Sequence, residues 1–153
     1  MASLKTRLHD DLNAARKARD ELTTATLRMV LSAVTTEEVA GKTARELSDD
    51  EVLKVLAREG KKRREAAEAF DAGQRPELAQ KERDEAAILA EYLPEQLTAE
   101  EVHKLVTATI DQLGVAGDGM KAMGRVMGAL QPQVKGRADG GVVAAEVKKA
   151  LGA

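Results

Sequence analysis

Apolar residues recur three or four positions apart along almost the whole chain, and this spacing constrains the fold most strongly. Leu4, Leu8 and Leu12 show it near the start, and Val143 and Val147 repeat it near the end. Residues spaced in this way share one face of an α-helix, whereas a half-buried strand alternates at every second position. The periodicity therefore predicts an all-α protein.

Capping signals divide the chain into seven predicted helices. Ser48 and Thr98 each stand three residues before a glutamate, which is the capping-box pattern of a helix N-terminus. Ser3 and Asp139 are further N-cap candidates, and Pro132 is expected to end the sixth helix. Residues 22–39 contain enough β-branched side chains for a strand, but their length and the lack of an internal turn favour a helix. The helices are expected near residues 4–19, 22–40, 49–72, 76–93, 99–113, 120–131 and 140–151.

The segment YLPEQL, residues 92–97, separates two groups of these helices. We expect an N-terminal four-helix domain over residues 1–94 and a small, tail-like three-helix domain over residues 95–153. A domain as small as the second buries little apolar surface and is marginally stable alone.

Composition limits the class of protein. The chain has no cysteine, which excludes disulfides and thiolate metal sites and favours a reducing compartment. It has no apolar run near the ~20 residues that span a bilayer. Phe70 and Tyr92 are its only aromatic residues, too few for a stacking platform for single-stranded nucleic acid. We expect a soluble cytoplasmic protein with no metal, no cofactor and no membrane partner.

Catalytic residues are not evident. The two histidines, His9 and His103, have no second histidine near them in sequence, and no glycine-rich phosphate loop follows a strand. In a chain with 26 acidic residues, pairs of glutamates such as Glu82 and Glu85 indicate ion pairs on helix surfaces. We therefore expect no enzyme activity from this chain on its own.

Glycine and positive charge concentrate near the C-terminus. Residues 119–137 contain four basic residues and no acidic residue. Residues 102–153 hold seven basic and four acidic residues, although moving the cut back to residue 95 brings this part to zero net charge. Cations without nearby acids suit a phosphate backbone. The candidates for RNA contact are Lys121, Arg125, Lys135 and Arg137.

The glycines of the same stretch have an architectural interpretation. Gly124 and Gly128 share a helix face, which favours tight packing against another helix and leaves contact with a nucleic-acid strand as the alternative. Gly136 and Asp139 lead into the last helix, where Asp139 would cap the free N–H groups. A phosphate would then meet Lys135 and Arg137 beside the cap. We interpret all four residues as structural.

A second basic cluster lies within the third helix. It consists of Lys61, Lys62, Arg63 and Arg64 and has acidic residues at helical spacing on both sides. This pattern favours a solvated, ion-paired face, with RNA contact as the alternative. Gly60 precedes the cluster and costs about 1 kcal/mol relative to alanine in a helix interior.

Several pieces of the sequence together resemble the GatB/YqeY family. They are LKTRLHDDLNAARKARD, TLRMVLSAV, LSDDEVLKVL, KKRREA, ERDEAAILAEYLPEQL and GMKAMGRVMGALQPQVKGRADGG, in this order. The resemblance implies a helical domain followed by a three-helix tail, akin to the C-terminal region of the B subunit of tRNA-dependent amidotransferase. That region helps to hold tRNA, while the chemistry lies in a catalytic domain that has no counterpart here. The resemblance does not account for Gly60, where relatives usually carry a bulkier residue.

Three hypotheses follow. The first is a small non-catalytic tRNA-binding or amidotransferase-accessory protein, with tRNA and an amidotransferase or aminoacyl-tRNA synthetase complex as expected partners. The second is a protein-interaction module that uses a methionine stripe of the tail, Met120, Met123 and Met127. The third, carbon–nitrogen ligase activity with glutamine as amido donor, is implied by the family resemblance alone.

Overall fold

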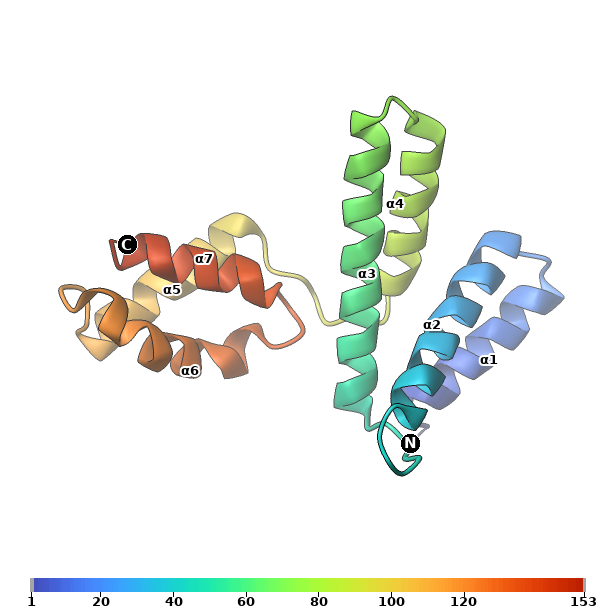
Figure 1. The fold of residues 1–153 in the computed structure, drawn as a ribbon, viewed down its shortest axis with the longest axis horizontal. Coiled ribbons are helices and arrows are strands. Elements are labelled where there is room, and N and C mark those ends of the chain that lie inside the picture. Colours follow the sequence, from blue (N-terminus) through green and yellow to red (C-terminus); the bar gives the residue numbers. More distant parts are fainter. Residues whose placement is uncertain (1, 153) are drawn as a thin grey trace. The chain divides into compact units, whose positions relative to one another are not determined.

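The computed structural model describes residues 2–152, and every regular element in this range is a helix (Figure 1). The all-α prediction is therefore confirmed. The elements are α1 (Leu4–Lys17), α2 (Glu21–Val39), α3 (Asp49–Ala72), α4 (Pro76–Ala90), α5 (Ala99–Leu113), the short 3-10 helix η1 (Gly119–Ala122), α6 (Met123–Val134) and α7 (Gly140–Ala150).

Most of the predicted start signals of the helices are formed. Ser3 accepts a hydrogen bond from the N–H of Thr6, and both capping boxes, at Ser48 and Thr98, are formed. Gly114 follows α5 in the left-handed conformation, with φ of 64°. The segment with many β-branched residues is the helix α2. Among residues 2–152, no helix is both long and apolar enough to cross a membrane.

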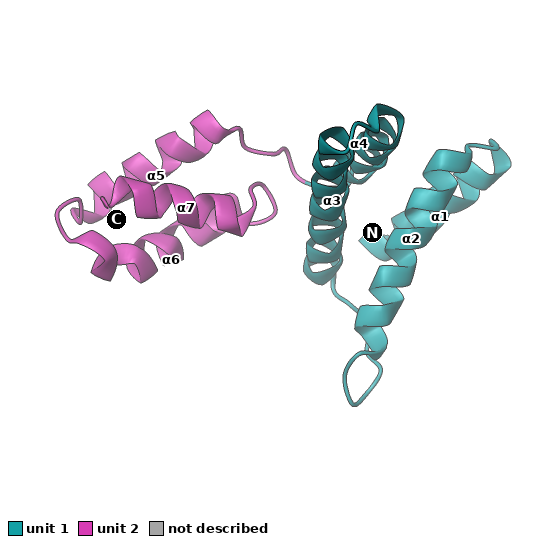
Figure 2. Cartoon of the chain, turned by 45° about the horizontal axis from the view of Figure 1, so that its top comes forward, with its two compact units in different colours: residues 1–93 teal, residues 94–153 magenta. Residues whose placement is uncertain are grey.

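The chain forms two compact units, residues 1–93 and 94–153 (Figure 2). In unit 1, short turns join α1 to α2 and α3 to α4, so each pair forms an antiparallel hairpin (Figure 1). Helix α2 packs against both α3 and α4 and so connects the two hairpins. Unit 2 contains α5, η1, α6 and α7.

The core of unit 1 is aliphatic and joins all four helices. Its buried residues are Leu8, Leu27, Val30, Leu31, Val34, Leu47, Val52, Val55, Leu56 and Leu89. Away from this cluster, the α3–α4 hairpin buries the small residues Ala67, Ala79 and Ala86. In the same hairpin, Leu78 is 39% exposed while its neighbour Ala79 is fully buried.

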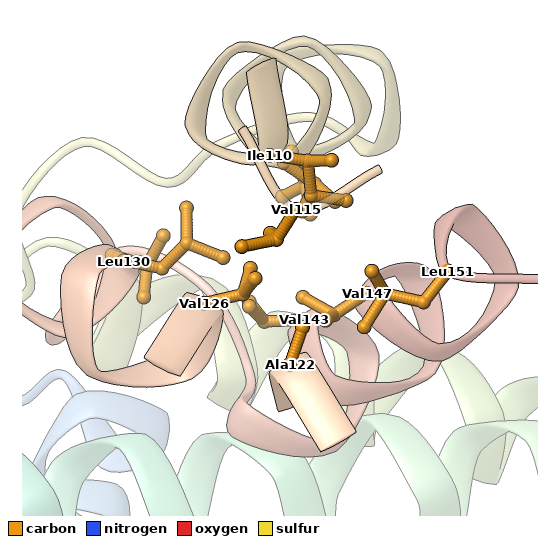
Figure 3. Close-up of a cluster of buried hydrophobic side chains, with 11 residues drawn as sticks. Ile110, Val115, Ala122, Val126, Leu130, Val143, Val147 and Leu151 are labelled. Atoms are coloured by element: carbon orange, nitrogen blue, oxygen red, sulfur yellow. The ribbon is translucent and has the colours of Figure 1, made fainter. Parts of the chain in front are cut away.

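Unit 2 has its own core, drawn in Figure 3, where side chains from α5, α6 and α7 converge. Val126 and Leu130 of α6 meet Val143 and Val147 of α7 there, and all four are fully buried. The three methionines expected to share one stripe are divided in the structure. Met123 and Met127 pack at the edge of this core, whereas Met120 is 45% exposed.

The sixth helix does not end at Pro132. Helix α6 continues to Val134, with the proline inside it. Pro132 has no N–H to donate to the carbonyl of Gly128, so this turn lacks one helical hydrogen bond. Val134 is only 6% exposed, and its burial with Leu130 holds the last turn against the core.

Polar contacts connect α1 with other parts of unit 1. Lys5 Nζ donates to both carboxylate oxygens of Glu38, at 2.8 and 3.0 Å, and the N–H of Leu47 donates to the same group at 3.0 Å. The hydrogen bond from Lys5 is the main reason that the pKa of Glu38 is lowered. At the end of α4, Tyr92 Oη donates to Asp11 at 2.6 Å. Helix α1 is thus tied to α2 and to the residues that follow α4.

Candidate nucleic-acid interface

Arg125 lies on α6, Lys121 on η1 directly before it and Lys135 in the turn directly after it, and all three residues are exposed. Lys121 and Arg125 are four residues apart, which is close to one turn of a helix that has 3.6 residues per turn. The opposite side carries Val126 and Leu130, which are fully buried. Core packing therefore determines that the three cations face solvent together. We call this surface the α6 basic face.

Gly124 and Gly128 lie on the α6 basic face as well, and both are exposed. A Cβ atom added to either glycine would meet no other atom within 4 Å. The interpretation that they allow another helix to pack closely is therefore wrong within unit 2. They leave helix backbone bare between the cations, at a cost of about 1 kcal/mol relative to alanine in a helix interior.

Acidic residues of unit 2 are concentrated elsewhere. Residues 94–153 contain seven basic and seven acidic residues, so the unit has no net formal charge. Four of the seven acids lie between residues 95 and 111, on α5 and the segment before it. Residues 119–138 contain four cations and no acid. The relevant asymmetry is therefore local, between helices of one unit.

The cations of the α6 basic face differ in their surroundings. Lys121 and Arg125 form no ion pair within residues 2–152. Lys135, by contrast, does interact with another group of the protein. On α5, Lys104 pairs with Glu100 at 3.8 Å, and Nδ1 of His103 lies 2.5 Å from a carboxylate oxygen of Glu146 on α7. His103 therefore connects α5 to α7.

Arg137 forms hydrogen bonds with the backbone of the segment that begins unit 2. Its Nε donates to the carbonyl of Glu95 at 3.2 Å, and its Nη1 approaches the carbonyl of Gln133 at 3.4 Å. The carbonyl of Arg137 accepts from the N–H of Leu97 at 2.8 Å. Arg137 is half-buried and lies outside the α6 basic face.

Gly136 lies in the turn between α6 and α7. Its φ is +72°, in the region that glycine adopts without strain, and an added Cβ would lie 3.7 Å from the ring of Pro94. Gln96 Nε2 donates to its carbonyl at 2.8 Å. Asp139 occupies the N-cap position of α7, but its side chain makes no capping hydrogen bond, contrary to expectation. The loop before α7 is instead fixed by the segment that precedes α5.

The basic cluster of α3 is mixed with acids. Lys61 and Arg64 are exposed, and Lys61 interacts with the protein. Lys62 Nζ lies 3.3 Å from Glu59, which is buried. The helix is continuous through Gly60. This arrangement agrees with an ion-paired face more than with an open cationic surface.

Arg63 points inward, and its side chain is only 16% exposed. Its guanidinium lies 3.3 Å from Glu85, 3.6 Å from Glu59 and 3.8 Å from Glu82, and it also contacts the sulfur of Met29. Burial, followed by the charge of Glu82, raises the pKa of Glu85. Arg63 therefore neutralises glutamates of α3 and α4.

The described residues contain no group of three histidine, cysteine, aspartate or glutamate side chains that could hold a metal ion. His9 and His103 are both exposed. The surface with the most distinctive chemistry is therefore the α6 basic face.

Comparison with known proteins identifies the family. A family model described as Yqey-like protein matches residues 5–151. The chain belongs to the YqeY-like family. This family is related to the C-terminal domains of GatB-like proteins, as the resemblance of the sequence pieces indicated.

Two curated relatives of this YqeY-like chain are fungal. An uncharacterised protein of Schizosaccharomyces pombe is 36% identical over 80 residues, which cover 52% of the chain and 63% of that protein. A protein of Pyrenophora tritici-repentis named Altered inheritance of mitochondria protein 41, mitochondrial, is 28% identical over 151 residues, covering 96% of the chain and 80% of the relative. The chain thus spans less than two thirds of the first relative.

Proposed function

We propose that this chain is a non-catalytic tRNA-binding protein, accessory to tRNA-dependent amidotransferase or aminoacyl-tRNA synthetase complexes. The observation that carries the proposal is the α6 basic face, where Lys121, Arg125 and Lys135 are exposed in a segment without acidic residues. The kinship with GatB-like C-terminal domains supports the choice of tRNA as the RNA.

The chemistry of the face suits a folded RNA. Double-stranded RNA is recognised mainly through phosphates and 2′-hydroxyl groups, because its deep major groove hides the base edges. Lysine and arginine donate to phosphate oxygens, and the bare backbone at Gly124 and Gly128 leaves room for a strand beside them. The two aromatic rings of the chain, Phe70 and Tyr92, are only half-exposed and lie in unit 1.

The test is a titration of the full chain with unfractionated tRNA at about 50 and 200 mM salt. Lys121→Ala/Arg125→Ala/Lys135→Ala should lower the affinity roughly 10- to 100-fold and reduce the slope of log affinity against log salt by about 2. The charge-matched control is Lys61→Ala/Lys62→Ala/Arg64→Ala in unit 1, which should change the affinity by less than about 3-fold.

Two results would overturn the proposal. One is the absence of tRNA binding by the unchanged chain at low salt. The other is an equal loss of affinity in the two triple variants, which would mean that tRNA binding depends on the net charge of the chain and not on the α6 basic face. Circular dichroism of each variant checks that it remains folded.

A further inference from the structure

The last turn of α1 borders a hollow that neither the core nor the α6 basic face uses. Its volume is about 470 Å³, and Asn13, Arg16 and Lys17 line it. The hollow is open to solvent, because all three lining residues are exposed. The lining offers a guanidinium, an ammonium and an amide, which are all hydrogen-bond donors.

The cations at this hollow lack acidic partners. Arg16, Lys17 and the following Arg19 are all exposed, and none forms an ion pair within residues 2–152. Asp20, the next acid along the chain, is already occupied as the N-cap of α2. It accepts hydrogen bonds from the N–H of Thr23 at 3.0 Å and from the Thr23 hydroxyl at 2.7 Å.

The alternative is that these cations only offset the negative end of the α1 dipole. The last carbonyls of the helix do not depend on them, however. The N–H groups of residues 18–20 donate to three of these carbonyls at distances of 2.9–3.2 Å. Side chains that are not required for capping remain able to donate to a ligand.

Arg19 is a further exposed cation, in the turn that follows α1. Its φ is +58°, a conformation in which glycine is favoured and most other residues are strained by about 1 kcal/mol or more. Glycine at this position would relieve the strain and remove the charge. Gln74, in the turn between α3 and α4, has the same φ of +58°, so this backbone conformation belongs to the hairpin turn and does not itself indicate a ligand.

We propose that the hollow at the end of α1 binds a phosphate group of the RNA backbone, so that the RNA is held by unit 1 as well as by unit 2. This inference rests on the proposed function. Arg16 and Lys17 donate to the phosphate oxygens, and the Asn13 amide donates to a phosphate oxygen or accepts from a ribose hydroxyl.

The test uses the full chain with unfractionated tRNA and compares Arg16→Ala/Lys17→Ala with Lys42→Ala/Arg75→Ala. The control removes two other exposed unit 1 cations that form no ion pair within residues 2–152. At the hollow, the double variant should weaken binding about 10-fold and reduce the salt slope by about 1.5, whereas the control should change the affinity less than about 3-fold.

Each outcome has a distinct meaning. If the hollow variant binds like the control while Lys121→Ala/Arg125→Ala/Lys135→Ala binds roughly 10- to 100-fold more weakly, this inference is overturned and the proposed function stands. If the unchanged chain does not bind tRNA, both are overturned. A lower unfolding temperature of the hollow variant with unchanged tRNA affinity would support the dipole alternative and also overturn the inference.

Discussion

The two basic clusters of this chain already differ in their acidic neighbours in sequence, and the folded protein makes the difference concrete. The cluster on α3 places Arg63 among three glutamates and Lys62 beside Glu59. On the α6 basic face, Lys121 and Arg125 have no acidic partner within the described residues. A cluster of cations is therefore informative about binding only after the neighbouring helices have been considered.

The reason is electrostatic. A guanidinium that approaches several carboxylates in a partly buried site is neutralised by them, and its removal leaves their charges uncompensated. An exposed cation with no partner contributes little to folding and remains available to a phosphate. The same residue type thus serves stability in unit 1 and is proposed to serve RNA binding in unit 2.

The largest expected effect on stability is that of Arg63→Ala. It leaves the carboxylates of Glu59, Glu82 and Glu85 without their shared cation and should lower the free energy of unfolding of unit 1 by about 2–3 kcal/mol. The fluorescence of Tyr92, the only tyrosine in the chain, reports unit 1 alone during urea unfolding.

The matched control for that change is Arg64→Ala, which removes the adjacent, exposed arginine. Its effect should stay within about 0.5 kcal/mol. If both variants lost the same stability, the contrast between an inward and an outward arginine on α3 would not hold.

A smaller effect, of opposite sign, is expected at the glycines. Gly128→Ala places a methyl group in open solvent on α6 and should stabilise unit 2 by about 0.5–1 kcal/mol, because alanine favours the helix. The comparison is Gly60→Ala in unit 1, whose Cβ would lie 3.4 Å from the movable Nη1 of Arg64 and should gain no more than that. Urea unfolding followed by circular dichroism measures both, and loss of stability in Gly128→Ala would reveal packing on that face.

The smallest effect concerns pH. Since the pKa of Glu85 is raised in the folded state by burial and by Glu82, the folded chain binds this proton more tightly than the unfolded chain does. The contribution of Glu85 to stability is therefore lost as pH rises through its folded pKa. Glu85→Gln should improve the stability of unit 1, relative to the unchanged chain, more at about pH 7 than at about pH 4. Tyr92 fluorescence in urea at both values checks this, and a difference that shrinks with rising pH would contradict the assignment.

Much of the fold could be predicted because its signals are local. Ser48 and Thr98 marked helix starts through residues three positions away, and Val143 and Val147 marked a buried face through their spacing. The misplaced end at Pro132 shows the limit of such signals. A missing hydrogen bond stops a helix only where packing does not hold the next turn, and Val134 is packed.

The candidate site was predicted less completely. The sequence grouped Arg137 with Lys121 and Arg125, although Arg137 binds the carbonyl of Glu95, some 40 residues earlier in the chain. The sequence did not predict the hollow at Asn13. The only related feature in the sequence was a short run of cations at the end of α1. A hollow depends on how elements meet, which local spacing does not specify.

The sequence by itself determined the helices, their caps and most of their buried faces, because these depend on residues three or four positions apart on the same helix. Only the tertiary structure decided that Arg63 pairs with Glu85 of α4 and that Gly124 and Gly128 face solvent. It also decided that Arg137 binds the backbone of the segment before α5. Those outcomes depend on which faces of different helices meet, and packing of the whole unit sets that arrangement.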